Sequence, residues 1–294
     1  MTSAKSAIAV LTYNRVESLA TCLKGLKDHC GKTPVAVFED CGGMDETESL
    51  LTRGSKVKSG FADSIESDQY TGWLPNISVF MGRRNLGVAA QSNKAIAWMR
   101  HIRADHLVII NDDIEVRGPF EDFYRKAHAD LGIGMFCFCD FTSDSYRWRS
   151  ARSNGYTVKI LSRMTGIAIS ITRDLVDRIG YFDTRFGKFG EEHCDYTHRA
   201  RMAGLLKFEG SDVLCVDVDH KFLAHQEVET SLQGPERGRA DAIASMVMSQ
   251  VGPLYATTNP YRKFSLETPL VAGGRDGEGI STTALNRYTF VPAV

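Results

Sequence analysis

The chain has 294 residues, of which 43% are hydrophobic and 24% charged, and its formal net charge is -1 at pH 7. This is the composition of a globular protein with a large core, so it excludes wholesale disorder. The near-neutral charge argues against a chain built to coat nucleic acid or an anionic membrane, and no apolar run approaches the ~18 residues that span a bilayer.

The N-terminal residues and the cysteines predict the cellular compartment of the protein. The first six residues lack the basic segment and apolar run of a secretory signal. The seven cysteines are odd in number and form no C-x-x-C pair, which predicts reduced, mostly buried thiols. We therefore expect a cytoplasmic protein without a transmembrane segment, and assembly into an oligomer stays open.

Short apolar runs alternate with helix-period segments along the first half of the chain. Strands are expected at residues 7–11, 35–38, 77–81 and 107–110, and helices over residues 16–26 and 87–103. A continuous apolar run such as residues 7–11 is typical of a strand buried on both faces. The alternation predicts an α/β fold with a largely parallel sheet and helices on both faces.

The second half of the chain changes character. Further strands are expected at residues 133–139 and 167–171, and a helix over residues 189–203. Beyond residue 253 the chain is rich in Gly, Thr and Pro with weak periodicity, which predicts extended or loop structure.

These patterns predict one main domain followed by an appendage. The main domain covers residues 1–252, with a first half over residues 1–140 and a second half over residues 141–252. Residues 253–294 form a C-terminal extension.

Ligands bind parallel α/β sheets beyond the carboxyl ends of the strands, so polar residues just after each strand are candidates for a site. Thr12, Tyr13, Asn14 and Arg15 follow the first strand, Asp40 the second, and Asn111, Asp112 and Asp113 the fourth. Where a helix begins, its N-terminus attracts anions, and Arg15 could meet a phosphate there. The alternative is simple helix capping by Thr12 or Asn14.

The run Asn111-Asp112-Asp113 is the strongest local signal. Mg²⁺ or Mn²⁺ takes one or two protein carboxylates and completes its shell with substrate phosphates. The alternative is a solvated acidic turn. His220 and His225 follow an apolar run, and a histidine could complete a shell begun by Asp113. We take Asp113 and His220 as the predicted metal ligands.

Acidic residues also open the helix expected over residues 189–203. Glu192, Asp195 and Arg199 share one helical face, and Glu191 precedes them. A carboxylate that faces a cleft could act as a general base. The alternative is that the glutamates complement the helix dipole while Asp195 pairs with Arg199 at i,i+4.

The order and spacing of these motifs resemble the family-two glycosyltransferases of the GT-A fold, over roughly residues 6–225. Residues 9–15 look like the family's first strand and nucleotide loop, and residues 38–47 like its second-strand motif. Asn85-Leu86-Gly87, with Asn93 beyond it, is similar to the N-x-G helix start. Asn111-Asp112-Asp113 stands where the family has D-x-D. Residues 165–166, 180–183 and 192–199 resemble its acceptor-side half. The resemblance therefore implies a nucleotide-sugar-binding half over residues 1–140 and an acceptor or catalytic half over residues 141–252.

The resemblance implies a Rossmann-like, mixed, mostly parallel sheet flanked by helices. It implies transfer of a sugar from a nucleotide-diphosphate sugar to an acceptor hydroxyl, usually with inversion, and with Mn²⁺ or Mg²⁺ held at Asp113. The residues implied for donor binding are Thr12, Tyr13, Asn14, Arg15, Asp40, Arg84, Asn85, Gly87, Asn93, Asn111 and Asp112.

Two departures from the family pattern bear on the chemistry. Asn111 replaces the first acidic residue of D-x-D. Glu192-His193 stands where the family often has Glu-Asp, whose Asp is usually the base. The candidate bases are Glu192, Glu191 and Asp195, with His193 left open.

The acceptor and two rival functions stay open. The basic and aromatic stretch 146–163 would suit a phosphate-bearing acceptor, such as a lipid-linked diphosphate, a teichoic-type polymer or nucleic-acid bases. The alternative is a solvated basic loop. A nucleotidyltransferase would usually carry a Gly-rich basic loop after the first strand, where this chain has Thr-Tyr-Asn-Arg. A degenerate, non-enzymatic binding module is the other rival.

Overall fold

The computed structural model describes residues 5–40, 45–71, 76–139, 147–161, 166–226, 234–256, 261–264 and 288–291. Three parts of the sequence motifs lie outside these residues. They are the segment 41–44 after Asp40, residue Thr165 and the ends of the basic stretch 146–163.

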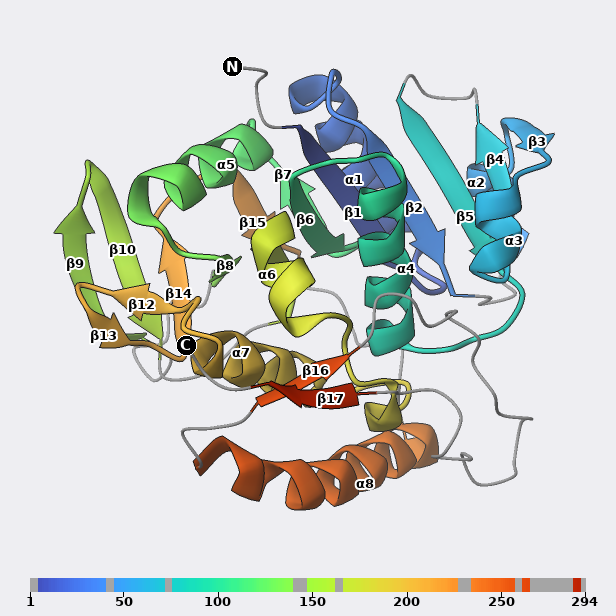
Figure 1. Ribbon diagram of the computed structural model, residues 1–294. Helices are drawn as coiled ribbons and strands as arrows, with labels where there is room; N and C mark the ends of the chain where they lie inside the picture. Colours follow the sequence, from blue (N-terminus) through green and yellow to red (C-terminus); the bar gives the residue numbers. More distant parts are fainter. Residues whose placement is uncertain are drawn as a thin grey trace.

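An eight-stranded sheet forms the centre of the molecule, in the order β3-β4-β5-β2-β1-β6-β11-β8 (Figure 1). Its strands are β1 (Ser6–Thr12), β2 (Val35–Glu39), β3 (Ser55–Val57), β4 (Ser67–Thr71), β5 (Ile77–Gly82), β6 (His106–Asn111), β8 (Met135–Cys137) and β11 (Ala168–Thr172). The central strands β5, β2, β1 and β6 run parallel, and β4 and β11 join them antiparallel on either side. This confirms the predicted mixed sheet.

Helices flank this sheet, as predicted. The helices are α1 (Val16–His29), α2 (Asp45–Leu51), α3 (Gly60–Ser64), α4 (Val88–His101), α5 (Phe120–Leu131), α6 (Arg173–Ile179), α7 (Glu192–Met202) and α8 (Gly234–Val251). Helix α4 packs along β1, β2 and β6, and α5 packs along β1 and β6. Every side chain of β1 beyond Ser6 is buried, because this strand lies in the middle of the sheet.

Smaller antiparallel sheets complete the second half. Strands β9 (Arg147–Ser153), β10 (Tyr156–Leu161) and β14 (Cys215–Val218) form one of them, and β12 (Lys207–Phe208) pairs with β13 (Ser211–Asp212). Strand β7 (Ile114–Val116) pairs with β15 (Leu223–His225) directly after the end of β6. The described part of the basic stretch is therefore a hairpin, β9–β10, and not a loop.

The C-terminal part of the chain packs against the helices of the second half. The short helices η1 (Thr184–Phe186) and η2 (Gly252–Ala256) contact α8, and β16 (Tyr261–Phe264) pairs with β17 (Tyr288–Val291). Figure 1 shows α8 along the bottom of the view, below this β16–β17 pair. Strand β16 contacts α6 and α7, so the described part of the extension is tied to the main body.

The burial of the cysteines and the polarity of the helices bear on two further predictions. Cys22, Cys30, Cys137 and Cys215 are buried thiols, in agreement with the predicted reduced state. Across the described residues, every helix is too short or too polar to cross a bilayer.

Candidate functional site

The ends of β1 and β6 bring two of the predicted motifs together. The backbone N–H of Asp112 donates to Leu11 O at 3.0 Å, and the Thr12 hydroxyl donates to Asp112 Oδ2 at 2.7 Å. Burial raises the pKa of Asp112 to about 6, although Thr12, Arg15 and the Tyr13 backbone N–H favour its ionised form. Asp112 therefore fixes the loop after β1 to the end of β6.

Arg15 joins both acidic residues of the run. Its Nη1 lies 2.7 Å from Asp113 Oδ2 and 3.3 Å from Asp112 Oδ1. Around this ion pair, three buried polar atoms have no hydrogen-bond partner within the described residues: Asn14 Oδ1, Arg15 Nε and Asp113 Oδ1. Buried polar atoms are nearly always paired in native proteins, so three together point to a polar ligand at this place.

A single divalent cation fits part of this arrangement. Asp113 offers its unpaired Oδ1, and His225 Nε2 lies 3.6 Å from Asp113 Oδ2. The register of β15 on β7, with His225 opposite Ile114, brings the histidine there. Among the described residues no group of three or more His, Cys, Asp and Glu side chains is arranged to hold a metal. Such a cation would therefore depend on phosphate and water oxygens for the rest of its shell.

His220, which the sequence analysis chose as the second metal ligand, lies in a different environment. Its ring stacks on Phe138 and Phe222 and meets Phe123 and Tyr124 edge-on, with centroids 5.1–5.7 Å apart. Its Nδ1 accepts from the Phe222 backbone N–H at 3.2 Å. The structure therefore brings His225 rather than His220 to Asp113 and packs His220 among aromatic rings, and metal binding by either histidine stays a prediction.

Asp40, predicted to bind the nucleotide base, caps the start of α4. Its Oδ1 accepts from Leu86 N at 2.8 Å and its Oδ2 from Gly87 N at 2.6 Å, and Gln91 Nε2 also donates to Oδ1. Burial raises the pKa of Asp40, while these donors favour the carboxylate. Gln91 Oε1 is buried without a partner within the described residues, which puts a polar atom suited to a ligand beside Asp40.

The other residues predicted around α4 have structural contacts. Gly87 has φ +84°, and a Cβ at this position would lie 2.2 Å from Lys188 Cα, so only glycine fits. Arg84 Nη2 lies 2.5 Å from Glu66 Oε2, and Asn85 is half-buried in the turn before the helix. Asn93 bonds the backbone of Phe182 through both atoms of its amide.

Helix α7 begins with an acid–histidine pair. Glu192 Oε1 lies 2.6 Å from His193 Nδ1, and both residues are buried. Burial alone would raise the pKa of Glu192, but His193 and the backbone N–H groups at the helix start hold it below its usual range. This buried carboxylate is therefore ionised at neutral pH.

The two other candidate bases differ from Glu192. Glu191 is exposed and occupies the left-handed region, with φ +63°, just before the helix. Asp195 is fully buried, accepting from Arg199 Nε at 2.8 Å and from the Tyr255 hydroxyl at 2.7 Å. Asp195 therefore holds α7 to the rest of the fold, whereas Glu191, Glu192 and His193 have side chains that could act on a substrate.

The start of α7 lies one strand away from the Asn111-Asp112-Asp113 run. Asn111 N donates to Ile167 O at 2.9 Å, just before β11. The preceding residue, Gly166, is in contact with the His193 ring, because a Cβ there would lie 2.7 Å from His193 Nδ1. The polypeptide at residues 166–167 thus separates the acidic run from the Glu192–His193 pair.

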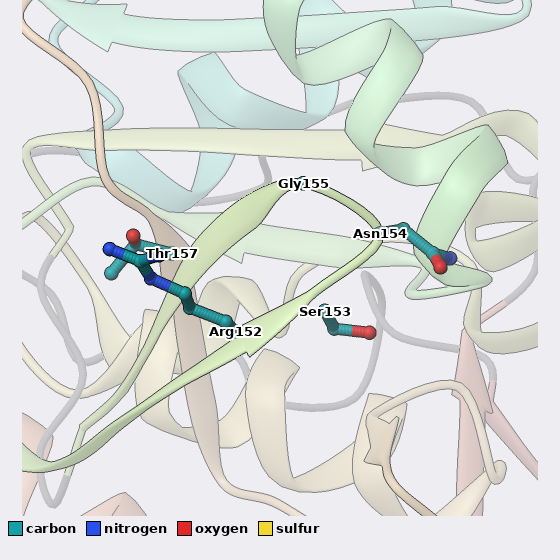
Figure 2. A pocket seen from close by; sticks show the side chains of 5 residues that line it. All are labelled: Arg152, Ser153, Asn154, Gly155 and Thr157. Atoms are coloured by element: carbon teal, nitrogen blue, oxygen red, sulfur yellow. The ribbon is translucent and has the colours of Figure 1, made fainter.

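The basic hairpin points away from this site at its tip. Figure 2 shows a surface hollow at that tip, lined by Arg152, Ser153, Asn154, Gly155 and Thr157. Asn154 Nδ2 donates to Asp130 O in the last turn of α5. That turn also carries His128, which meets Ser170 and, through it, His106 at the amino end of β6. The hollow therefore lies toward the amino end of β6, whereas Asp113 follows the carboxyl end of that strand.

Some contacts at the site had no clear signal in the sequence. The partnership of His225 with Asp113 depends on the β7–β15 pairing, which joins two segments that lie far apart in the chain. Gln91 lies within the helix expected over residues 87–103, where no pattern distinguishes it from an ordinary surface residue. Gly166 lay within a family-like motif, but its contact with His193 follows only from the fold.

Comparisons with known proteins bear on the fold. Neither a protein-family model nor a curated protein sequence matches the chain. Among solved structures the chain resembles GalNAc-T7 in complex with UDP, GalNAc and Mn²⁺, with a TM-score of 0.53 and 14% identity over 82% of this chain and 48% of that one. It resembles S. aureus TarS with a TM-score of 0.50 and 14% identity, over 83% and 40%.

A third likeness is to the mannosyltransferase PcManGT from Pyrobaculum calidifontis in complex with GDP-Man and Mn²⁺, with a TM-score of 0.47 and 17% identity over 69% and 53%. The chain spans about half the length of these three proteins, at 48%, 40% and 53%. The likenesses to GalNAc-T7 and TarS, together with the mixed sheet, show that the chain has the GT-A fold.

Proposed function

We propose that this chain is a glycosyltransferase that moves a sugar from a nucleotide-diphosphate sugar to an acceptor hydroxyl, with inversion and with a divalent cation. The observation that carries this proposal is the group of buried atoms Asn14 Oδ1, Arg15 Nε and Asp113 Oδ1 at the carboxyl end of the parallel strands, none of which has a hydrogen-bond partner among the residues that the structure describes. Leaving a buried polar atom unpaired costs about 1–3 kcal/mol, so a polar ligand that pairs with all three is favoured there.

The donor diphosphate and its cation together suit this group of atoms, because Arg15 Nε can donate to a phosphate oxygen whereas Asn14 Oδ1 and Asp113 Oδ1 are acceptors that can face a cation. Arg15 offers a guanidinium edge, and Asn14 lies at the turn into α1, where backbone N–H groups attract anions. Asp113 and His225 are the residues that would hold Mn²⁺ or Mg²⁺. The hydrogen bond from Thr12 to Asp112 fixes the loop after β1 to the end of β6 beside them. The bound cation would supply positive charge that stabilises the leaving diphosphate.

The nucleoside would lie toward α4. Gln91 Oε1 is an unpaired buried acceptor that could take a hydrogen bond from a base, beside the Asp40 cap. In this proposal Asp40, Gly87 and Asn93 shape the donor pocket through the backbone contacts they make, and Tyr13, Arg84, Asn85 and Asn111 line its approaches.

The transfer step needs a base on the acceptor side. The N-terminus of α7 presents Glu192 and His193 across residues 166–167 from the acidic run. An acceptor hydroxyl that gives its proton to this pair can attack the anomeric carbon from the face opposite the diphosphate. One displacement of this kind inverts the anomeric configuration.

A donor-binding module without turnover is the second candidate. The observation that favours it is the ion pair of Arg15 with Asp113, which places a positive charge at the carboxylate that would bind the cation. In such a module the arginine would substitute for the metal in holding a diphosphate.

A donor panel tests both candidates. The purified chain is mixed with UDP-, GDP-, dTDP- and CMP-sugars, each with Mn²⁺, Mg²⁺ or chelator, and its melting temperature is measured. A ligand that binds the folded state stabilises it in proportion to the logarithm of its concentration over Kd. Metal-dependent stabilisation with slow release of nucleoside diphosphate supports the enzyme. Metal-independent stabilisation without release supports the module. Release of pyrophosphate from a nucleoside triphosphate that is offered together with a sugar 1-phosphate would instead indicate a nucleotidyltransferase.

A further inference from the structure

The first two residues of α7 have the geometry of an oriented general base. We propose that His193 Nε2 accepts the proton of the acceptor hydroxyl and that Glu192 is the residue that positions its ring. This inference rests on the proposed glycosyltransferase function and assigns the base within it. It moves the catalytic role from the carboxylates favoured by the sequence to the histidine beside them.

The contact between the two side chains fixes the tautomer of the histidine. An ionised carboxylate only accepts hydrogen bonds, so at 2.6 Å from Glu192 Oε1 the Nδ1 of neutral His193 must carry the hydrogen. The basic lone pair is then on Nε2. Within the described residues no hydrogen bond engages Nε2, so this atom is available to a substrate.

The surroundings keep the pair in place. Side-chain exposure is only 5% for Glu192 and 11% for His193, so water screens their interaction little. Phe182 packs edge-on to the imidazole, with ring centroids 5.5 Å apart, and Gly166 also lies against the ring. A side chain at position 166 would collide with Nδ1, Cε1 and Cγ of the ring, at 2.7, 2.9 and 3.1 Å. The glycine therefore provides the space that the imidazole occupies.

Glu192 is a poor base by comparison. Its carboxylate already accepts from His193 and from the backbone N–H groups of Gly190 and Glu192, and its pKa is held low. A carboxylate that is stabilised in its ionised form has little tendency to take a proton from a hydroxyl. The same negative charge stabilises the imidazolium that forms when His193 takes the proton.

The proposed step transfers one proton, forms one bond and breaks one bond. The acceptor O–H proton passes to His193 Nε2 as the oxygen forms a bond to the anomeric carbon. The bond from that carbon to the diphosphate oxygen breaks, and its electron pair leaves with the nucleoside diphosphate. The imidazolium then returns its proton to water. With water in place of the acceptor, the same step gives hydrolysis of the donor.

The charges around the ring predict how the step depends on pH. Gly166 and Phe182, which pack against the ring from other elements, are uncharged, and the acidic groups on its own helix are Glu192 and, one residue earlier, the exposed Glu191. The rate should therefore rise with pH through the ionisation of an imidazole. Replacing Glu192 by Gln keeps an oxygen for Nδ1–H but removes the charge, so that ionisation should move to lower pH.

The tautomer is measured first, on the ligand-free wild type with ¹⁵N-labelled histidines. Two-bond ¹H–¹⁵N spectra should place the His193 proton on Nδ1 at pH 8, assigned by its loss in His193→Gln. In Glu192→Gln the His193 titration midpoint should fall, because the carboxylate charge that favours the imidazolium is lost. An Nε2–H tautomer in the wild type, or a midpoint unchanged by Glu192→Gln, overturns the proposal.

Turnover is measured next, as release of nucleoside diphosphate from UDP- and GDP-sugars with Mn²⁺ and water as acceptor. His193→Ala should lower kcat by about 10²–10⁴-fold with donor affinity unchanged, the range of a lost general base, and free imidazole should restore part of the rate. His198→Gln is the matched control on the same helix, because His198 stacks on Tyr255, and it should keep wild-type kcat.

The outcomes separate this inference from the function on which it rests. Wild-type rates in His193→Ala, with all turnover lost in Glu192→Gln, would make Glu192 the base and overturn only the assignment. Absence of donor binding and of nucleoside diphosphate release in the wild type would overturn the proposed function and the base together.

Discussion

Asn93 on α4 holds the backbone of Phe182 with both atoms of its side-chain amide. Its Nδ2 donates to Phe182 O at 3.1 Å, and its Oδ1 accepts from Phe182 N at 2.7 Å. These contacts join residues that are 89 positions apart. Asn93 thereby ties the helix beside the predicted nucleoside pocket to the segment that precedes α7, where Phe182 packs against His193.

Replacing Asn93 should therefore cost stability before it changes donor binding. Asn93→Ala leaves a buried N–H and a buried C=O of Phe182 without partners, which should lower the free energy of unfolding by about 2–3 kcal/mol. Urea unfolding of the ligand-free protein measures this. Asn85→Ala, at a half-buried turn position, is the control and should change stability by about 0.5 kcal/mol or less. Full stability with weakened donor binding would instead return Asn93 to a direct role in the donor site.

The buried ion pair on α7 gives a second prediction about stability. Arg199 Nε bonds Asp195 Oδ2 at 2.8 Å, and its other nitrogens donate to the carbonyls of Ile179 and Tyr181. Arg199→Met would leave Asp195 charged, buried and without its cation, so the free energy of unfolding should fall by about 3–5 kcal/mol.

The matched control for Arg199 is Arg178 on α6. It makes the same i,i+4 pair with Asp174, at 3.4 Å, but both side chains are exposed. Exposed pairs contribute little, so Arg178→Met should change the free energy of unfolding by about 0.5 kcal/mol or less. Chemical denaturation of both variants measures the difference. Equal losses in the two would contradict the structural role given to Arg199.

The sequence could predict the central sheet because its signals are local. The apolar run at residues 7–11 and the helical stripe at residues 16–26 correspond to β1 and α1, with ends that differ by at most three residues. Strands such as β9 and β10 carry charged residues on an edge sheet, and α8 has no strong apolar face, so neither gave a clear periodic signal.

The site could be predicted only where strand ends determine it. Thr12 and Asp112 meet because β1 and β6 are adjacent and parallel, which follows from the βαβ pattern. Partners brought together by other pairings could not be foreseen. His225 reaches Asp113 through an antiparallel pairing of two three-residue strands, and no local pattern distinguishes it from His220, which the sequence analysis chose.

Removal of the Asp113 carboxylate should abolish the effect of metal. Asp113→Ala deletes the unpaired Oδ1 and the partner of His225, so Mn²⁺ should no longer raise the melting temperature with donor or support release of nucleoside diphosphate. Glu115→Gln is the control, because this exposed carboxylate pairs with Arg117 two residues beyond the site. Thermal-shift titration with Mn²⁺ measures the effect. Wild-type turnover that continues in excess chelator would contradict metal dependence altogether.

A chain of hydrogen bonds at the opposite edge of the sheet predicts how stability depends on pH. His128 Nδ1 lies 2.5 Å from the carbonyl of Ile133 and must carry the hydrogen, so its Nε2 accepts from the Ser170 hydroxyl at 2.8 Å. His106 Nε2 then donates to Ser170 Oγ at 2.7 Å, and its Nδ1 accepts from Ser6. Every group is satisfied when both rings are neutral.

Protonation of either ring would break this chain. Burial lowers the pKa of His128 to about 4 and that of His106 well below its usual value. The unfolded chain, with histidine pKa values near 6.5, binds protons first, so the stabilisation is complete above about pH 6.5 and is lost as the pH falls toward 4. For His128 alone the loss amounts to about 3 kcal/mol.

The contribution of His128 is best measured as a difference between proteins. Asp217 is buried with its pKa raised to about 7, so it contributes stability at low pH that is lost as the pH rises from about 4 to 7, the opposite slope. Comparing the wild type with His128→Gln cancels the contribution of Asp217, because both proteins contain it. The free-energy difference should be largest at pH 7–8 and shrink steadily toward pH 4, while the exposed control His29→Gln stays level with the wild type. Parallel pH profiles for the wild type and His128→Gln would show that the ring is not held neutral by the fold.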